Sequence, residues 1–300
     1  MKDWFSEVYA VADKIRNLEI QGATNIALTS LKVMKKIIKN VDLTKENYKK
    51  IYNAIEVLKY ARITEPTNRN CLNILENYLN KVKDKKKIIE LIDKIMSDIK
   101  NSKRRIALIG SRYLEDKSKI LTICHSSTVI ELLKEAKNSG KNIEVYVPET
   151  RPLYQGRLTA KDLLKYKIPV YFFVDNVLST IINDIDIVIV GSDSILADGS
   201  LINKIGTKIV AILAYKYDIP FLVASSIFKV NLDSLYGIKE KIEYRDVEEV
   251  WKDAPKGIKI INPAFDYVPS KYISIYITEL GLIPPQKIAE EAKKFFENYF

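Results

Sequence analysis

Apolar residues in the first third of the chain recur three or four positions apart, the spacing of one helix face. The segments with this pattern are residues 3–39, interrupted at Gly22, then 47–60, 70–82 and 86–114. Pro66 lies in a polar segment between the second and third of these and predicts a loop there. The pattern therefore predicts an all-helical domain over residues 1–115.

After residue 115 the pattern changes to short apolar runs that alternate with helical segments. The predicted strands are residues 120–124, 143–147, 170–174, 187–190, 221–224 and 273–278, and the helices are 126–138, 158–166, 177–183, 204–216 and 287–299. Strand and helix alternating at this pace are typical of right-handed crossovers in a parallel sheet. We expect an α/β protein: an N-terminal all-helical domain (residues 1–115) followed by a Rossmann-like, doubly wound parallel-sheet domain (residues 116–300).

The run at residues 187–190 is continuously apolar, which is typical of a parallel strand buried on both faces. It stops at Gly191, and Asp193 follows at the carboxyl end of the strand. After a loop that contains glycine, we expect a helix to begin near Asn203 and Lys204. Open α/β sheets bind their ligands at this edge.

Parallel strands bring all their carboxyl ends to one edge, so residues far apart in sequence should meet there. These residues are Cys124, His125, Ser126 and Ser127; Glu149, Thr150, Arg151 and Gln155; Asp175 and Asn176; Ser192 and Asp193; and Ser225, Ser226 and Lys229. Thiol, carboxylate and cationic groups around one crevice suit acid–base chemistry on a small anionic substrate. Cys124 directly precedes a predicted helix, whose dipole favours the thiolate.

The net charge of +10 lies entirely in residues 1–115, which contain 24 Lys and Arg and 14 Asp and Glu. The lysines are spread along several helices without interleaved aromatic residues, which is typical of a solvated surface, so we expect no direct DNA binding. A polyanionic or acidic protein partner remains an alternative. Apolar residues make up 47% and charged residues 29% of the chain, as in ordinary soluble proteins.

Several classes of function are disfavoured by what the sequence lacks. Two cysteines, Cys71 and Cys124, and a single histidine argue against a disulfide framework, a zinc enzyme and a Ser-His-Asp hydrolase. Neither a GxGxxG nor a GxxxxGK[ST] motif occurs, so we expect no nucleotide cofactor and no metal. No apolar stretch reaches the roughly 18 residues that span a bilayer, and the N-terminus does not resemble a signal peptide, so we expect a cytoplasmic protein without a membrane partner.

Five segments resemble one family. They read TICHSSTV (122–129), ETRPLYQGRLTAKDL (149–163), GSDSILADGSLINKIGT (191–207), NPAFDYVP (262–269) and ITELGLIPP (277–285). Together they resemble the archaeal ribose-1,5-bisphosphate isomerases. That group shares a fold with the methylthioribose-1-phosphate isomerases and with the alpha, beta and delta subunits of translation initiation factor 2B. The resemblance covers nearly all of the second predicted domain and is thinner in the first.

The resemblance implies a catalytic pair, Cys124 and Asp193, and a set of substrate-binding residues. That set is Gln21, Gly22, Ala23, Arg62, Ser126, Ser127, Arg151, Gln155, Asn203, Lys204 and Lys229. Gln21 stands where the isomerases have an arginine, so one phosphate-facing cation is replaced by a neutral amide. Read without the resemblance, Gly22 and Ala23 form either an interhelical turn or a helix start whose free amides could hold a phosphate.

Two functions follow from the resemblance. The first is an aldose–ketose isomerase that converts ribose 1,5-bisphosphate to ribulose 1,5-bisphosphate, or acts on another sugar 1-phosphate such as methylthioribose 1-phosphate. The second is a regulatory subunit like those of initiation factor 2B, which binds initiation factor 2 and senses a sugar phosphate or nucleotide. Cys124 and Asp193 favour the enzyme, whereas Gln21 and the basic helical domain favour the regulator. The resemblance also implies a homo-oligomer, a dimer or hexamer, and AMP as an effector.

Overall fold

The chain forms two compact units in the computed structural model, which describes residues 4–62, 64–238 and 240–300. The helical unit contains the residues up to Asn101, together with Phe228–Asn231 and Glu290–Phe300. The sheet unit contains Ser102–Ile227 and Leu232–Ala289. The predicted division, residues 1–115 and 116–300, describes two continuous segments, whereas each compact unit contains more than one segment of the chain.

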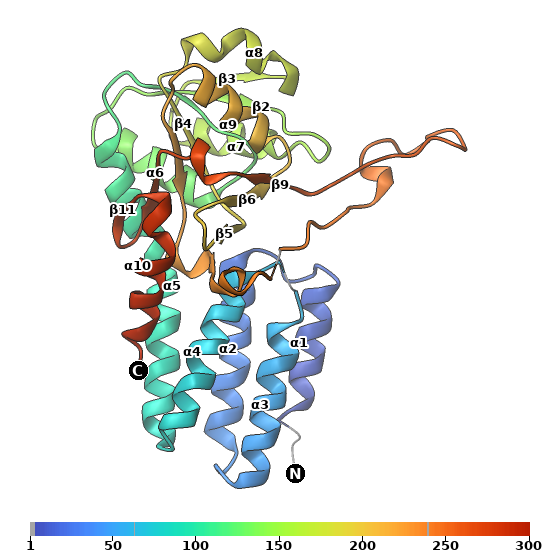
Figure 1. Ribbon diagram of the computed structural model, residues 1–300, viewed down its shortest axis with the longest axis vertical. Helices are drawn as coiled ribbons and strands as arrows, with labels where there is room; N and C mark the ends of the chain where they lie inside the picture. The colour runs from blue at the N-terminus through green and yellow to red at the C-terminus, as the bar shows by residue number, and fades with distance from the viewer. Residues whose placement is uncertain (1–3, 63, 239) are drawn as a thin grey trace. The chain divides into compact units, whose positions relative to one another are not determined.

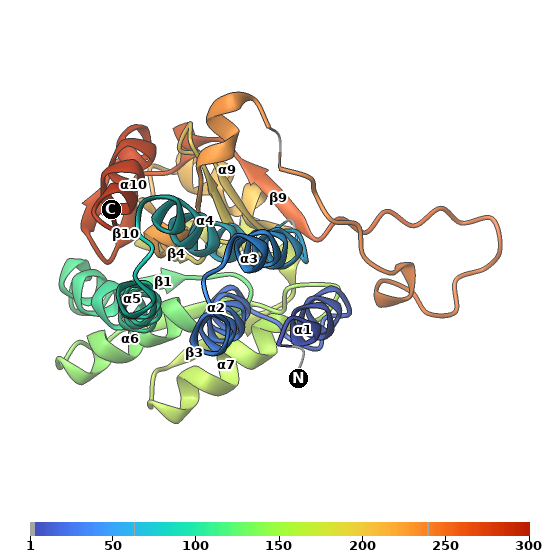
Figure 2. The ribbon, with the colours of Figure 1, turned by 90° about the horizontal axis from the view of Figure 1, so that it is seen from below.

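The helical unit is a bundle whose helices lie side by side and are seen end-on in Figure 2. They are α1 (Ser6–Arg16), α2 (Ala23–Asn40), α3 (Lys45–Lys59), α4 (Pro66–Lys81) and the first part of α5 (Lys85–Tyr113). Each helix turns its apolar stripe inward, and fully buried residues such as Met34, Ile55 and Leu75 form the core. Each such side chain contributes about 1.5–3 kcal/mol by its removal from water. The predicted helices are confirmed, and no strand occurs in the described part of residues 1–115.

The helix ends of the bundle follow from local chemistry. Gly22 precedes α2 with a φ of 84°, a conformation that glycine adopts without steric cost. The Thr44 hydroxyl accepts the Asn47 N–H (3.3 Å) at the start of α3. Pro66 is the first residue of α4, where its missing N–H would have no partner in any case. The predicted loop around Pro66 is therefore shorter than expected.

Two later segments of the chain return to the helical unit. They are β8 (Val230–Asn231), with the residues just before it, and most of α10 (Ile288–Glu297). The Asn70 side-chain amide donates to the carbonyls of Phe228 (2.9 Å) and Val230 (2.8 Å). The Phe228 ring lies edge-on to Phe295, with centroids 5.3 Å apart, and the Tyr299 hydroxyl donates to Asp98 (2.6 Å). These buried contacts make the returning segments part of the bundle.

The sheet unit contains a seven-stranded sheet in the order β11-β10-β7-β4-β1-β2-β3. Its strands are β1 (Lys119–Leu121), β2 (Glu144–Pro148), β3 (Val170–Phe173), β4 (Ile187–Val190), β7 (Phe221–Ala224), β10 (Ile275–Thr278) and β11 (Gly281–Ile283). Only the edge pair β10–β11 is antiparallel among these pairings. Strands β4 and β7 are buried along their whole length, as their continuous apolar sequence predicts. The predicted doubly wound fold is confirmed.

Helices cover both faces of this sheet. The helices are α6 (Ser127–Asn138), α7 (Gln155–Lys165), the short α8 (Leu178–Ile181) and α9 (Thr207–Lys216). Figure 2 shows α6 and α7 on one side of the strands and α9 on the other. This is the arrangement that right-handed crossovers impose when the chain leaves a central strand in opposite directions.

One prediction in this region is wrong. Asn203 and Lys204 do not begin a helix but end the strand β6 (Leu201–Lys204), and α9 begins at Thr207. Strand β6 pairs antiparallel with β5 (Ser194–Leu196) and β9 (Phe265–Val268). Strands of three or four residues are too short for periodicity to distinguish them from loops.

A long excursion, residues 240–261, leaves the sheet unit before β9 and extends away from its strands in both views (Figures 1 and 2). Its regular structure is a 3₁₀ turn, Val247–Glu249, and an isolated antiparallel bridge between Tyr244 and Pro263. Among the described residues, no helix combines the length and the apolar character needed to cross a bilayer.

Candidate active site

The candidate site lies where the sheet reverses its winding direction. Strand β1 pairs with β2 on one side and with β4 on the other. Cys124 comes three residues after β1, and Asp193 comes three residues after β4. Neighbouring strands are about 4.8 Å apart, so both residues leave the same edge of the sheet beside each other. Ligands of open α/β sheets bind at such a switch point.

The thiol of Cys124 is linked electrostatically to two of the other predicted site residues. Burial raises the pKa of this thiol to about 11, and the backbone N–H of His125 lowers it. The Asp193 carboxylate raises the pKa further, and the Lys204 ammonium lowers it. A carboxylate and an ammonium group therefore both act on this thiol at the edge of the sheet. Burial raises the pKa of the thiol by more than the neighbouring backbone N–H lowers it, and the expectation that the α6 terminus favours a thiolate stays a prediction.

The backbone of Cys124 has an unusual conformation. Its φ is 66°, in the left-handed region that residues other than glycine seldom adopt. Two threonine side chains bind its peptide groups: the Cys124 N–H donates to Thr150 Oγ1 (3.0 Å), and Thr159 Oγ1 donates to the Cys124 carbonyl (2.6 Å). Such a conformation costs about 1–3 kcal/mol and persists only where surrounding contacts hold it.

Arg151 and Gln155 lie beyond the end of β2, as predicted. The Arg151 guanidinium donates to the Tyr154 hydroxyl (2.6 Å) and to the carbonyls of Pro152 (3.2 Å) and Val250 (2.8 Å). These acceptors are neutral, so its charge remains available to an anion. Gln155 begins α7, and within the described structure its buried carbonyl oxygen has no hydrogen-bond partner. A buried acceptor without a partner is costly unless a ligand hydroxyl satisfies it.

Asn203 and Lys204 reach the crevice from β6. Both side chains are buried, and the Asn203 amide donates to Thr207 Oγ1 (3.0 Å). Within the described residues Lys204 forms no ion pair. A buried ammonium without a carboxylate partner is unfavourable, and an incoming phosphate would relieve that cost.

Ser126 and Ser127 stand at the start of α6. The Ser126 hydroxyl accepts the N–H of Val129 (3.4 Å) and caps the helix. Gly191, at the end of β4, lies so close that a Cβ there would be 2.5 Å from Ser126 Oγ. Ser127 is exposed in the first turn, where free amides favour an anion. The glycine thus allows this helix start to approach the residues after β4.

The remaining predicted residues belong to the helical unit: Gln21, Gly22, Ala23, Arg62 and Lys229. The Gln21 side-chain amide donates a hydrogen bond to the backbone carbonyl of Leu18 (2.6 Å). The Arg62 guanidinium lies 3.5 Å from the Glu65 carboxylate. A phosphate would have to compete with these local partners. That these five residues join the sheet-unit residues around one ligand stays a prediction.

Sequence reasoning missed a buried carboxylate at the same edge of the sheet. Glu279 follows β10 and accepts hydrogen bonds from the Ser226 hydroxyl (2.6 Å) and the Ile227 N–H (3.0 Å). Burial raises its pKa, while these hydrogen bonds and Arg105 lower it. Glu279 lies in one of the segments that carry the family resemblance, but no spacing or composition signal marks it.

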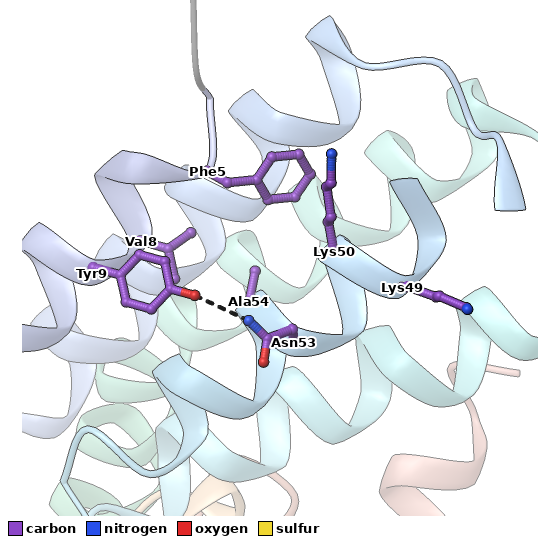
Figure 3. Close-up of a pocket in the computed structure, with 7 residues that line it drawn as sticks. All are labelled: Phe5, Val8, Tyr9, Lys49, Lys50, Asn53 and Ala54. Carbon is purple, nitrogen blue, oxygen red and sulfur yellow. Dashed lines mark hydrogen bonds between the residues drawn. The ribbon is translucent and has the colours of Figure 1, made fainter. Parts of the chain in front are cut away.

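A separate hollow of about 490 Å³ lies in the helical unit between α1 and α3 (Figure 3). It is lined by Phe5, Val8, Tyr9, Lys49, Lys50, Asn53 and Ala54. Tyr9 accepts a hydrogen bond from Asn53 (3.1 Å), and Lys50 pairs with Glu46 (2.8 Å). Its lining holds neither a thiol nor a carboxylate, so it lacks the acid–base pair of the sheet edge. No group of three or more potential metal ligands occurs within the described residues.

Sequence comparison gives close relatives over almost the whole chain. A family model described as the initiation factor 2 subunit family matches residues 19–285. The ribose 1,5-bisphosphate isomerase of Methanocaldococcus jannaschii is 40% identical over 298 residues, which cover 98% of this chain and 96% of that protein. The methylthioribose-1-phosphate isomerase of Acetivibrio thermocellus is 35% identical over 314 residues, covering 95% of this chain and 90% of that protein.

Structural comparison gives the same grouping. The crystal structure of the translation initiation factor eIF-2B of Pyrococcus horikoshii superposes with a TM-score of 0.77 at 25% sequence identity. The match covers 94% of this chain and 98% of that one. The fold at the sheet edge is therefore one that proteins named as isomerases and as an initiation factor have in common.

Proposed function

This chain belongs to the initiation factor 2 subunit family, and from that premise we propose that it is an aldose–ketose isomerase that converts ribose 1,5-bisphosphate to ribulose 1,5-bisphosphate. The resemblance found in the sequence is confirmed by relatives that carry the name ribose 1,5-bisphosphate isomerase. The observation that carries the proposal is the placement of Cys124 and Asp193, each three residues beyond one of the neighbouring strands β1 and β4 at the switch point. Asp193 and Lys204 both act on the pKa of the Cys124 thiol there. This supports an acid, a base and a phosphate-binding cation in one crevice.

The substrate determines what the site must do. A phosphate ester on C1 blocks the simple opening of the furanose to an aldehyde. In the proposed reaction Asp193 protonates the ring oxygen as its bond to C1 breaks. Cys124 then takes the proton from C2, which gives an enol. It returns that proton to C1 while the C2 hydroxyl gives its proton to the Asp193 carboxylate and becomes the carbonyl, which restores both groups.

The proposed reaction requires opposite protonation states of Asp193 and Cys124. The reaction needs the proton on Asp193 and the negative charge on Cys124. The ionised carboxylate raises the pKa of the thiol, so a proton on Asp193 removes one obstacle to the thiolate. Lys204 stabilises the thiolate once it forms.

The phosphates require cations and donors at both ends of the sugar. Arg151 supplies a guanidinium whose present acceptors are neutral, and Lys204 supplies a buried ammonium. Asn203 and Gln155 offer amide groups to sugar hydroxyls, and Ser126 and Ser127 stand at a helix start. The family resemblance adds five residues of the helical unit to the proposed substrate-binding set: Gln21, Gly22, Ala23, Arg62 and Lys229. We place the enzyme in the cytoplasm as a homo-oligomer.

The decisive test is turnover. Purified protein is incubated with ribose 1,5-bisphosphate, and ribulose 1,5-bisphosphate is measured. We expect Cys124→Ser and Asp193→Asn each to lower kcat by about 10²-fold or more, the usual contribution of a positioned acid or base. Cys71→Ala is the matched control, because Cys71 is a fully buried core residue and its loss should leave turnover intact. Equal turnover in Cys124→Ser and wild type would exclude the proposed mechanism.

A second candidate function has its own support. The net charge of +10 over residues 1–115 and the neutral Gln21 suit a regulatory subunit that binds initiation factor 2 and senses a sugar phosphate. The structural relative from Pyrococcus horikoshii carries the name of such a factor. Absence of turnover in the wild type, together with specific binding of initiation factor 2, would favour this function over the enzyme.

A further inference from the structure

We infer that Thr150 and Thr159 are positioning residues that together hold the peptide groups of Cys124 and so aim its thiol within the crevice. We call this pair of hydroxyls the threonine clamp. The inference rests on the proposed function in that it treats Cys124 as the acid–base group. It goes beyond that function because neither threonine touches the substrate in the proposed reaction.

Thr150 holds the amide side of Cys124. Its hydroxyl accepts the Cys124 N–H (3.0 Å) and donates to the Pro148 carbonyl (3.3 Å), so both its donor and one acceptor position are used. Thr150 has a φ of 59°, and its own N–H donates to the Asp175 carboxylate (2.8 Å). The same carboxylate accepts the Arg151 N–H (2.8 Å). Asp175, from the end of β3, thus fixes the loop that presents Thr150.

Thr159 holds the carbonyl side. It is buried in α7, and its hydroxyl donates to the Cys124 carbonyl (2.6 Å). Because that bond uses the only hydroxyl hydrogen, Thr159 Oγ1 must accept from His125 Nδ1, which lies 3.2 Å away. His125 therefore carries its proton on Nδ1, and its Nε2 lies 3.6 Å from the Asp162 carboxylate.

The clamp matters because the thiol direction depends on the backbone of one residue. Cys124 lies in the left-handed region, and release of either hydroxyl would let its φ relax toward the ordinary regions. Such a rotation would carry Sγ away from Asp193 and Lys204, the charged groups that act on the thiol besides the adjacent His125 peptide. A shift of about 1 Å in a reacting group can lower a rate by about 10²-fold.

The test compares removal of each hydroxyl with its retention. Thr150→Val and Thr159→Val keep the shape and remove the hydrogen bonds, whereas Thr150→Ser and Thr159→Ser keep the hydroxyl. Two measurements are made on the full chain: kcat and KM with ribose 1,5-bisphosphate, and the rate of alkylation of Cys124 by iodoacetamide as a function of pH. Cys71 is fully buried and should stay unmodified in the folded protein.

We expect each valine variant to lower kcat by at least about tenfold with KM within about twofold, because binding groups stay in place. We expect its alkylation profile to move to lower pH, because a thiol released from the crevice regains solvent. The serine variants should follow the wild type in both measurements. Valine variants that keep the wild-type kcat and alkylation profile would overturn the inference. Serine variants whose kcat falls as far as that of the valine variants would overturn it as well.

The alkylation profile separates this inference from the proposed function. Should the wild type show no turnover, the proposed function fails, while the profile still reports whether the threonines set the environment of the thiol. Should a valine variant not fold, Asp175→Asn is the second variant, because it weakens the support of Thr150 from a half-buried position. It should move the alkylation profile in the same direction as Thr150→Val; an unchanged profile in folded Asp175→Asn would contradict the clamp.

Discussion

Cys124 combines a left-handed backbone with a thiol that keeps its proton well above neutral pH. The raised pKa links this residue to the stability of the fold. An unfolded chain ionises its cysteines near pH 8.5, whereas the folded protein holds the Cys124 proton up to about pH 11. The folded state therefore binds more protons across that range.

This linkage predicts how stability changes in alkali. The contribution of Cys124 is fully present below about pH 8.5 and is lost as the pH rises through 11. We expect the free energy of unfolding of the wild type to fall by about 3 kcal/mol more than that of Cys124→Ser between pH 8 and pH 11, as measured by urea unfolding. Both proteins contain Cys71, so its own ionisation cancels in the comparison. Parallel curves for the two proteins would contradict the raised pKa.

The buried carboxyl group of Glu279 gives a second prediction, in which the stability of the fold changes with pH in the acidic range. Burial raises the pKa of Glu279. Its contribution to the free energy of unfolding is therefore fully present below the pKa of the unfolded chain, near 4.5, and is lost as the pH rises through the pKa of the folded protein. Glu279→Gln can still bond Ser226 and Ile227 without a charge. We expect this variant to gain on the order of 1 kcal/mol relative to the wild type at pH 7. Thermal unfolding from pH 4 to 8 should show the stability difference between Glu279→Gln and the wild type shrink toward pH 4. A difference that stays constant over this range would refute the raised pKa of Glu279.

The contrast between these residues shows what the sequence could predict about the site. Cys124 and Asp193 follow apolar runs, so the rule on strand ends predicted both at one edge. Thr159 lies inside a helix and Glu279 after the last parallel strand, and their roles depend on which backbone groups they reach in three dimensions. The charge state of the thiol was also beyond prediction, because burial is a property of the packed fold.

At the scale of elements, α7 depends on one small residue. Gly156 lies in its first turn, and a Cβ there would be 1.9 Å from the Pro148 carbonyl oxygen. That oxygen belongs to the backbone of β2, so it cannot move without displacing the strand. The absence of a side chain at Gly156 is what lets the helix start beside the end of β2 and present Gln155.

We therefore expect Gly156→Ala to destabilise the protein by about 3 kcal/mol, the upper range for overpacking in a core. Urea unfolding measures the change. Lys161→Ala, at an exposed position of the same helix, is the control and should change the free energy of unfolding by less than about 0.5 kcal/mol. A Gly156→Ala variant as stable as the control would show that the end of β2 can move to accommodate the added methyl group.

The elements themselves were predictable where they were long or fully apolar. The helices of the bundle and the parallel strands followed from periodicity and from continuous apolar runs. The small antiparallel strands β5, β6 and β9 were not predicted, because each is only three or four residues long and β6 pairs with β9 across about 60 positions, as in Asn203 with Asp266. Without that pairing, Lys204 was expected on a helix rather than at the end of a strand.

At the scale of the whole molecule, the excursion exposes large apolar side chains. Tyr244 and Ile261 are 69% and 77% exposed, and Tyr236 just before the excursion is 84% exposed. Exposed apolar groups gathered on one segment are typical of a protein interface. The proposed homo-oligomer would remove them from water.

We expect Tyr244→Ser combined with Ile261→Ser to weaken self-association by at least about tenfold, because interface aromatic and aliphatic residues often contribute more than 1 kcal/mol each. Sedimentation velocity over a concentration series measures the change. Lys259→Ser in the same excursion is the control and should leave association unchanged. A wild-type protein that sediments as a monomer at all concentrations would refute this use of the excursion.

The two segments that return to the helical unit set the timing of its folding in the cell. Its first hundred residues emerge from the ribosome early, but Phe295 and Tyr299, which close its aromatic cluster, follow almost 200 positions later. At about 5–20 residues per second, the nascent bundle waits roughly 10–40 s for these partners. During that interval the bundle lacks the apolar side chains of the returning segments, and the surface that they cover in the folded protein is exposed.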